Sequence, residues 1–152
     1  MNVGANSTIR SGSLWIEAAN LNLGDGATLN SSALGGKPPS GASGTPIAPD
    51  GAGAGHGGRG ACCLNTTTKK QRDVWGGDMY AWKTVDKPWS FGSSGGTTVE
   101  GKDLGGKGGG RVNVTVTGFL VINGSIEADG GSVGEKGGGG SGGSLYVQAS
   151  RM

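Results

Sequence analysis

Residues 111–117 read RVNVTVT and residues 144–150 read SLYVQAS, so two segments separated by glycine runs share one alternating pattern. Residues 13–19, SLWIEAA, fit the same frame. Apolar residues at every second position are typical of a β-strand with one buried face. Because one strand pattern recurs far apart in the chain, we expect these segments to stack as successive turns of a single structure.

The segments beside these strands repeat as well. Residues 1–4, MNVG, match residues 21–24, LNLG, and a third short strand centres on Ile9, Leu29 and Ile126 in turn. Met1 and Met152 fall on the same repeat position, so the end of the chain reads into its beginning. The sequence therefore predicts an all-β parallel β-helix, or β-solenoid, with three short strands per turn and glycine-rich corners.

The alternation assigns side chains to faces. The long strands are expected to point aliphatic side chains inward, namely Leu14, Ile16, Ala18, Val112, Val114, Val116, Leu145, Val147 and Ala149. The second strands are expected to point Met1, Val3, Leu21, Leu23, Phe119 and Val121 inward. Trp15, Asn113 and Tyr146 then share one outward file, and Glu17, Thr115 and Gln148 share another.

Composition favours a stacked architecture over a layered one. The chain holds 36 glycines among 152 residues and is only 33% hydrophobic, which is thin for a conventional core. A solenoid needs few inward side chains per turn, and glycine suits corners with positive φ or close backbones. Disorder is the competing interpretation, but the alternation is too regular for a linker. A net charge of +2 argues against nucleic acid as a partner.

The chain divides into three parts of one domain. Residues 1–32 form the first solenoid coils, residues 33–110 a Gly/Pro-rich and Trp-rich insertion, and residues 111–152 further coils. The first half of the insertion is expected to be an extended loop or irregular coil. Its second half carries Trp75, Trp82 and Trp89, with Tyr80 and Phe91 between them, which indicates a local aromatic cluster.

The positions of the asparagines indicate that the protein enters the secretory pathway. Five asparagines begin an N-x-Ser/Thr sequon without proline: Asn6, Asn30, Asn65, Asn113 and Asn123. They predict a secreted or lumenal glycoprotein whose signal peptide lies outside this segment, since residues 1–13 contain no apolar stretch. The alternative is that Ser/Thr-rich corners follow asparagine by chance. Residues 119–122 are too few to cross a bilayer.

The cysteines Cys62 and Cys63 are adjacent, and adjacent residues rarely form an unstrained disulfide. In an oxidising compartment each is a candidate for a disulfide with a cysteine elsewhere or in another chain. Two cysteines and one histidine do not make a zinc site. We expect neither a metal nor a cofactor.

Several strings resemble the extracellular N-terminal region of large plant glycine-rich membrane-anchored proteins. They are GGRGACCL, DVWGGDMYAW, KPWSFGSSGGTT, GGKGGGRV, NGSIEADGG and KGGGGSGGSLYV, and they span residues 33–152 almost continuously. The resemblance implies a secretory-pathway protein with a longer ectodomain and a membrane anchor outside this segment. It implies no catalytic activity.

Candidate catalytic residues are few. Glu127 and Asp129 alternate onto one face, as the paired carboxylates of a polysaccharide-acting enzyme would, but solvated groups at a glycine-rich corner are the favoured interpretation. His56 lies in a glycine-rich segment, where a hydrogen bond that fixes the loop is favoured over catalysis. We therefore expect a protein that is not an enzyme.

Carbohydrate binding is the stronger alternative. Trp75, Tyr80, Trp82 and Trp89 are candidates for a platform on which sugar rings stack, with Lys69, Lys70 and Arg72 as partners for acidic uronates. The competing interpretation makes the tryptophans a satellite core, because a long insertion with few other apolar residues needs something to bury. Trp15 and Tyr146 are the better outward candidates.

Together these observations predict a non-enzymatic extracellular structural or matrix-contacting glycoprotein segment. Both ends of the predicted solenoid expose strand edges, which indicates either a fragment of a longer solenoid or copies that stack head to tail into a fibre. A cell-wall polysaccharide-binding ectodomain is the alternative, and a polysaccharide-acting enzyme a distant one.

Overall fold

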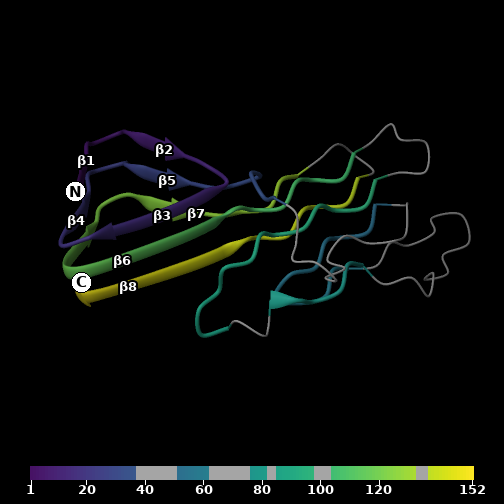
Figure 1. Ribbon diagram of the computed structural model, residues 1–152. Helices are drawn as coiled ribbons and strands as arrows, with labels where there is room; N and C mark the ends of the chain where they lie inside the picture. Colours follow the sequence, from purple (N-terminus) through teal and green to yellow (C-terminus); the bar gives the residue numbers. More distant parts are fainter. Residues whose placement is uncertain (37–50, 62–75, 82–84, 98–103, 133–136) are drawn as a thin grey trace, which may run out of the picture.

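The computed structural model describes residues 1–36, 51–61, 76–81, 85–97, 104–132 and 137–152. Their regular secondary structure consists of β-strands alone (Figure 1). The strands are β1 (Asn2–Val3), β2 (Thr8–Arg10), β3 (Ser13–Ala18), β4 (Leu21–Leu23), β5 (Thr28–Asn30), β6 (Arg111–Ile122), β7 (Ser125–Glu127) and β8 (Ser144–Arg151). The predicted all-β class is confirmed for these residues.

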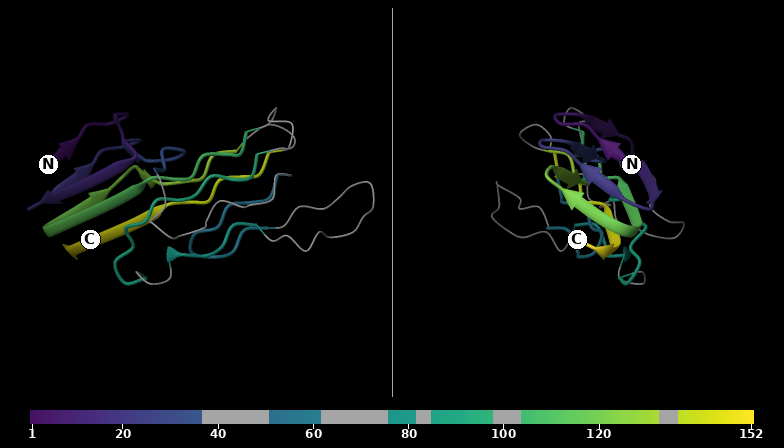
Figure 2. Two further views of the ribbon diagram at one scale, coloured as in Figure 1. Left: turned by 45° about the vertical axis from the view of Figure 1, so that its right-hand side comes forward. Right: turned by 90° about the vertical axis from the view of Figure 1, so that its left-hand side faces the viewer.

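Every strand pair among the described residues is parallel. β3, β6 and β8 lie side by side in that order, and β1, β4 and the last residues of β6 form a second row. β2, β5 and β7 form a third row. The rows curl around a common interior, as the end-on view in Figure 2 shows. Parallel strands need crossover connections, and here each crossover passes through strands of the other rows.

The predicted register of the long strands is confirmed. Ile16 pairs with Val114, and Val114 pairs with Val147. Trp15 and Tyr146 flank Asn113 in the same way. Since side chains on a strand alternate between faces, a correct register places every inward aliphatic residue in one column.

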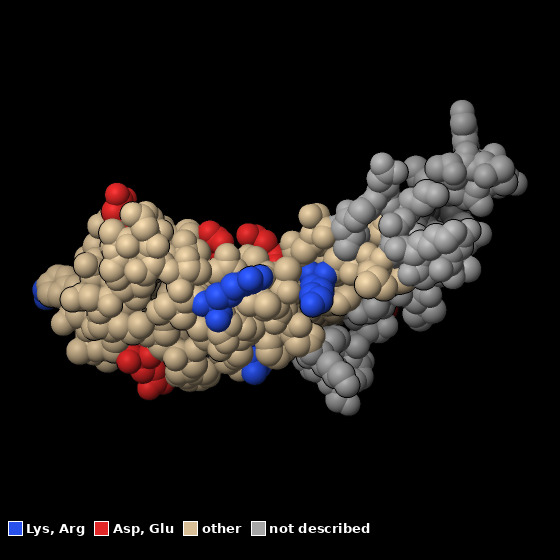
Figure 3. All heavy atoms as spheres, turned by 90° about the horizontal axis from the view of Figure 1, so that it is seen from above, with Lys and Arg blue, Asp and Glu red and all other residues tan. Residues whose placement is uncertain are grey.

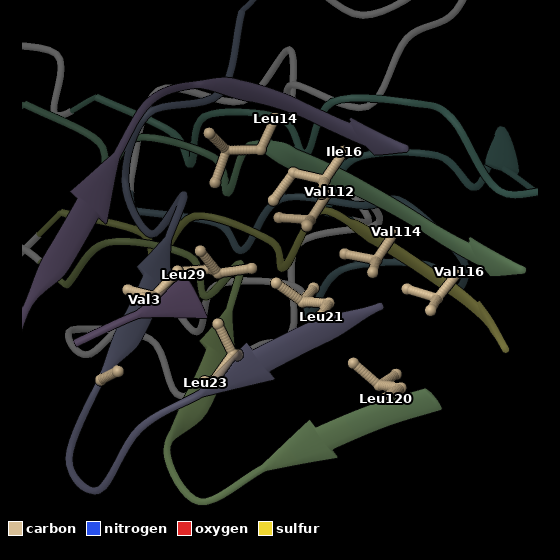
Figure 4. Packing of buried hydrophobic residues seen from close by; sticks show 11 residues of the cluster. Val3, Leu14, Ile16, Leu21, Leu23, Leu29, Val112, Val114, Val116 and Leu120 are labelled. Carbon is tan, nitrogen blue, oxygen red and sulfur yellow. The ribbon is translucent and has the colours of Figure 1, made fainter. Parts of the chain in front are cut away.

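The interior is a narrow aliphatic core between the three rows (Figure 4). Its buried members are Val3, Leu14, Ile16, Leu21, Leu23, Ala27, Leu29, Val112, Val114, Val116 and Leu120. Ile9, Ile126 and Ala149 pack against it while partly buried. β6 contributes four core residues and each shorter strand contributes one or two, so short strands are enough to close the core around β6.

The expectation that Phe119 and Val121 point inward is wrong. Phe119 is 55% exposed and Leu120 only 1% exposed, because β6 holds one residue more than its neighbours between Val116 and Leu120. At this irregularity the Phe119 amide donates to Asn20 Oδ1 at 2.8 Å. A single extra residue moves the following side chains to the opposite face. Met1, also expected inside, is 53% exposed.

The glycine-rich segments are joined by backbone hydrogen bonds where the structure describes them, although they contain no strand there. They run side by side as extended chains beyond the amino ends of β6 and β8 (Figures 1 and 2). Gly106 and Gly109 donate backbone hydrogen bonds to Gly138 and Ser141, at 2.8 and 2.9 Å. The bonded residues are three apart, whereas a β-ladder bonds every second residue. A period of three residues is that of the polyproline II helix.

These segments form a bundle rather than a sheet. Residues 104–110 bond through the backbone to residues 31–35, 92–95, 131 and 138–144, which is more than the two neighbours a strand has in a sheet. A Cβ atom on Gly109 would overlap the carbonyl oxygen of Ala128. Only glycine permits chains to approach so closely, as at the axis of collagen. The expectation of an extended loop or irregular coil concerned the first half of the insertion, whose described residues 51–61 contain no strand.

Candidate functional site

The outward side of β3, β6 and β8 carries two files of polar and aromatic side chains. In each strand the two outward side chains form a hydrogen bond with one another. The bonds are Trp15 Nε1 to Glu17 Oε1 at 2.8 Å, Thr115 Oγ1 to Asn113 Oδ1 at 3.2 Å, and Tyr146 OH to Gln148 Oε1 at 2.9 Å. We call these six residues the outward strip. It presents one aromatic ring at each side and amide and hydroxyl groups between them.

An aromatic residue of the predicted insertion packs against one end of the strip. The Trp89 ring meets the Trp15 ring edge to face, with 5.0 Å between the centroids. The Arg111 guanidinium lies over both the Trp89 ring, at 4.3 Å, and the Phe91 ring, at 4.2 Å. Such cation–π contacts stabilise by about 0.5–1 kcal/mol at exposed sites. They join residues 89–91 to β3 and β6.

Arg111 and Ser90 fix the position of this aromatic cluster. Arg111 donates from Nε to Ser13 Oγ at 3.1 Å and from Nη1 to the Trp89 carbonyl oxygen at 3.2 Å. Partial burial lowers the pKa of the Arg111 guanidinium, which remains charged at neutral pH. The Ser90 amide donates to Ser144 Oγ at 3.1 Å, and the Ser144 hydroxyl donates back to the Ser90 carbonyl oxygen.

The structure distributes the predicted platform residues differently from the expectation. Trp15 and Trp89 meet, and Tyr146 lies two strands from Trp15. Tyr80 is half-buried elsewhere, where its hydroxyl donates to the Phe91 carbonyl oxygen and accepts from Ser93 Oγ. Burial raises the pKa of Tyr80. Trp75 and Trp82 lie outside the described residues, as do Lys69, Lys70 and Arg72.

His56 lies where three glycine-rich segments meet. Its ring packs edge to face on Tyr80 at 5.1 Å, and its backbone carbonyl accepts from the Tyr80 amide at 2.8 Å. Within the described residues its Nε2 atom is buried without a hydrogen-bond partner. Burial lowers the pKa of His56, opposed by a hydrogen bond to the Ser90 backbone. Protonation would place a charge in this site, so the geometry favours a neutral packing residue.

The two candidate carboxylates serve as hydrogen-bond acceptors within the fold. Glu127 accepts from Asn30 Nδ2 and from Ser125 Oγ, both at 2.6 Å. The Asp129 carboxylate accepts from Ser32 Oγ at 3.4 Å. The bonds from Asn30 of β5 and from Ser32 just after β5 connect segments of the chain that are far apart in sequence. These carboxylates therefore have a structural role that requires no substrate.

The sequons differ in their surroundings. Asn6 and Asn123 are exposed at corners, and Asn6 has a left-handed φ of 56°. Asn113 is half-buried in the outward strip. Asn30 uses its amide nitrogen to bond Glu127, so the atom that would carry a glycan is already engaged. Asn65 lies outside the described residues.

Charge and metal-ligand chemistry are sparse in the described part. Acidic and basic side chains lie in small separate groups on the face seen from above (Figure 3). No group of three or more metal-ligating side chains occurs among the described residues. Cys62 and Cys63 lie outside them. The same residues contain no helix of a length and apolarity that would span a membrane.

Comparison with protein-family models, with curated proteins and with solved structures finds no match for this chain. The functional interpretation therefore depends on the sequence and the geometry of this chain. Sequence reasoning missed the Arg111 contacts with Trp89 and Phe91. The sequence contains only a weak indication of them. Arg111 is the first residue of a strand and points outward, but its distance along the sequence from residues 89–91 does not predict that they contact it.

Proposed function

We propose that this chain is a segment of a parallel β-solenoid with a structural, non-enzymatic role outside the cell, and that its copies stack head to tail. Three rows of three parallel strand segments support the solenoid, since each row receives one segment from each successive pass of the chain. The passes are β1–β3, then β4, β5 and the first half of β6, then the rest of β6 with β7 and β8.

The observation that carries the stacking proposal is a difference between the two ends of the core. In the first pass the inward residues Leu14 and Ile16 are each 9% exposed. In the last pass the corresponding Leu145 and Val147 are 43% and 38% exposed. Ile122, which belongs to the same pass and pairs with Leu23, is 37% exposed. Among the described strands, β8 pairs only with β6, so its outer edge and its apolar side chains lack a covering strand.

A second copy of the chain fits this open end. Its β3 repeats the pattern of β8 and would present Leu14 and Ile16 above Leu145 and Val147. Covering two aliphatic side chains that are about two-fifths exposed contributes on the order of 1 kcal/mol each. Pairing of β8 with that strand would add backbone hydrogen bonds along the edge.

The register continues across such a junction. Phe119 pairs with Arg151, which sets Met152 beside Leu120, and Leu120 pairs with Leu21. Asn2 pairs with Asn22, so Met1 occupies the position next to Leu21 in the same row. The β1 strand of a second copy would thus extend the row of β1, β4 and β6. A head-to-tail contact of this kind repeats without closing and yields a filament.

The extracellular assignment follows from the sequons and the resemblance to plant glycine-rich ectodomains. Asn6 and Asn123 lie at exposed corners, where a glycan leaves the strand edges free. Attachment to a membrane would come from an anchor outside this segment.

Sedimentation velocity over a range of concentrations, with electron microscopy of the concentrated sample, tests the stacking. We expect association that grows with concentration, and its loss in Val147→Lys, which places a charge on the open end. Gln148→Lys is the matched control, because it adds the same charge to the outward side of β8. Monomers at every concentration, or equal loss in both variants, would contradict the proposal.

A further inference from the structure

We propose that the outward strip on β3, β6 and β8 binds an uncharged polysaccharide chain laid across the strands. In this interaction one sugar ring stacks on Trp15 and another meets Tyr146. The strip lies on the outward side of β3, β6 and β8, whereas the head-to-tail contact would use the inward side chains and the outer edge of β8. Binding is therefore independent of the head-to-tail contact, and each can fail without the other.

Trp15 is an unusual residue to leave in solvent. Its side chain is 59% exposed on a strand whose alternate residues are buried. It is nevertheless held in place, because Trp89 packs against its ring at 5.0 Å and Glu17 accepts from its Nε1 at 2.8 Å. An aromatic ring fixed in one orientation before binding loses little conformational entropy when a ligand stacks on it.

The spacing of the two rings suits a linear ligand. Trp15 and Tyr146 occupy equivalent positions on β3 and β8, with Asn113 of β6 between them. Two strand spacings separate them by about 10 Å. That is close to the length of a disaccharide unit, so adjacent units of one chain reach both rings. Amide and hydroxyl groups of Asn113, Thr115 and Gln148 lie alongside for hydrogen bonds to sugar hydroxyls.

The charges beside the strip favour an uncharged ligand. Glu17 contributes one negative charge, and Arg111 contributes one positive charge next to Trp15 and Trp89. The Arg111 guanidinium already donates to Ser13 and Trp89 and stacks against two rings, so it is not a free site for uronates. A polymer with a carboxylate on every ring would meet the negative charge of Glu17, while the described cation beside the strip, Arg111, is already engaged.

The polar neighbours of Trp15 distinguish this surface from a protein interface. The centre of a protein interface is contiguous and apolar, with charged groups depleted. Here Trp89 packs against the ring on one side, but the outward neighbours toward the middle of the strip are Glu17, Asn113 and Thr115, all able to form hydrogen bonds. The surface thus combines a flat aromatic ring with hydrogen-bonding groups beside it. This combination suits a sugar, which has apolar C–H faces and hydroxyl groups at its edges.

Asn113 links this proposal to glycosylation. A glycan on its sequon would cover the space between Trp15 and Tyr146 and exclude a polysaccharide. The titration therefore uses protein produced without N-glycans. Trp89 supports Trp15 without being part of the strip, so it acts as a positioning residue.

The test is a calorimetric titration of the glycan-free protein with cellohexaose, and with an oligogalacturonate of equal length, accompanied by the shift of the Trp15 indole N–H signal in NMR. We expect cellohexaose to bind and to move that signal. Trp15→Ala should weaken binding at least tenfold, and Tyr146→Ala several-fold. Phe119→Ala is the matched control, since Phe119 is 55% exposed under Arg151 toward the carboxyl end of β6, outside the strip, and it should bind like wild type.

Three outcomes would overturn the inference. The first is a titration in which cellohexaose does not bind the wild-type protein. The second is stronger binding of the oligogalacturonate than of cellohexaose. The third is equal affinity of the Trp15→Ala and Phe119→Ala variants for cellohexaose. If Trp15→Ala in that case also changes the sedimentation profile, Trp15 belongs to a protein contact instead.

Discussion

The strand region and the glycine-rich bundle are both built from extended segments that lie side by side. Side chains hold the strand region together, whereas the backbone holds the bundle together. In the strand region, inward aliphatic side chains such as Val114 fill a core and the backbone bonds every second residue. In the bundle, segments such as 104–110 have almost no side chains to bury, and their backbones bond several neighbours at a period of three. One region is stabilised chiefly by apolar burial and the other by close backbone packing.

The difference determines how each region tolerates substitution. A core of side chains loses stability when a side chain is shortened, because a cavity and lost contacts remain. A bundle of bare backbones loses stability when a side chain is added, because the added carbon has no room. The two regions therefore respond in opposite ways to a change to or from alanine.

The largest effect is expected in the bundle. A Cβ on Gly138 would overlap the carbonyl oxygen of Ala52, whereas a Cβ on the adjacent Gly139 meets nothing within 4 Å. We expect Gly138→Ala to lower the free energy of unfolding by about 3 kcal/mol. Gly139→Ala should leave it unchanged or raise it by up to about 1 kcal/mol, since alanine restricts the unfolded chain. Urea denaturation measures both, and equal values for the two variants would show that the bundle is not close-packed.

A smaller effect is expected in the strand core. Val114 is fully buried, and Val114→Ala should cost about 2 kcal/mol through lost burial and the remaining cavity. Thr117→Ala on the same strand replaces an exposed side chain and should change stability by less than about 0.5 kcal/mol. The same denaturation experiment applies. A loss for Val114→Ala no greater than for Thr117→Ala would remove the burial argument for this region.

The smallest expected effect is a dependence of bundle stability on pH. Burial lowers the pKa of His56 below its usual 6.5, so the unfolded chain takes up a proton before the folded one does. The stability contribution is present above pH 6.5 and is lost as the pH falls toward the folded-state pKa. The protection factors of bundle amides, which correct for the intrinsic pH dependence of exchange, should fall over that range in wild type. His56→Gln, which cannot titrate, should reduce the change, and an identical profile in that variant would contradict the assignment.

The strand register could be predicted because it is encoded in side chains. Leu14, Val112 and Leu145 occupy equal places in an alternating pattern, and the pattern alone aligned three strands spread over the chain. It failed at Phe119, where one additional residue near Gly118 reverses the faces that follow. A bulge leaves no mark in hydrophobic periodicity unless neighbouring strands are compared residue by residue.

The bundle could not be predicted from the same signal. Glycine has no side chain, so a run of glycines does not indicate which face is buried, which residues pair or which segment is the neighbour. The same composition is also typical of a flexible linker. What specifies the arrangement is a set of close backbone contacts, such as Gly95 with Gly106, that is visible only in three dimensions.

The candidate site was predictable in part. Alternation placed Trp15 and Tyr146 outward on one file, but the arrival of Trp89 beside Trp15 depends on the path of the residues between them. Tyr80, grouped by spacing with the tryptophans, instead packs on His56. Sequence distance predicts contacts poorly where the chain leaves a regular strand.

Methyl–methyl nuclear Overhauser effects test the stacked strands most directly. With methyl-labelled protein, the account predicts cross-peaks from the Val114 methyl groups to both Ile16 and Val147, residues far from it in the chain. Cross-peaks from Val114 restricted to residues near it in sequence would contradict the account.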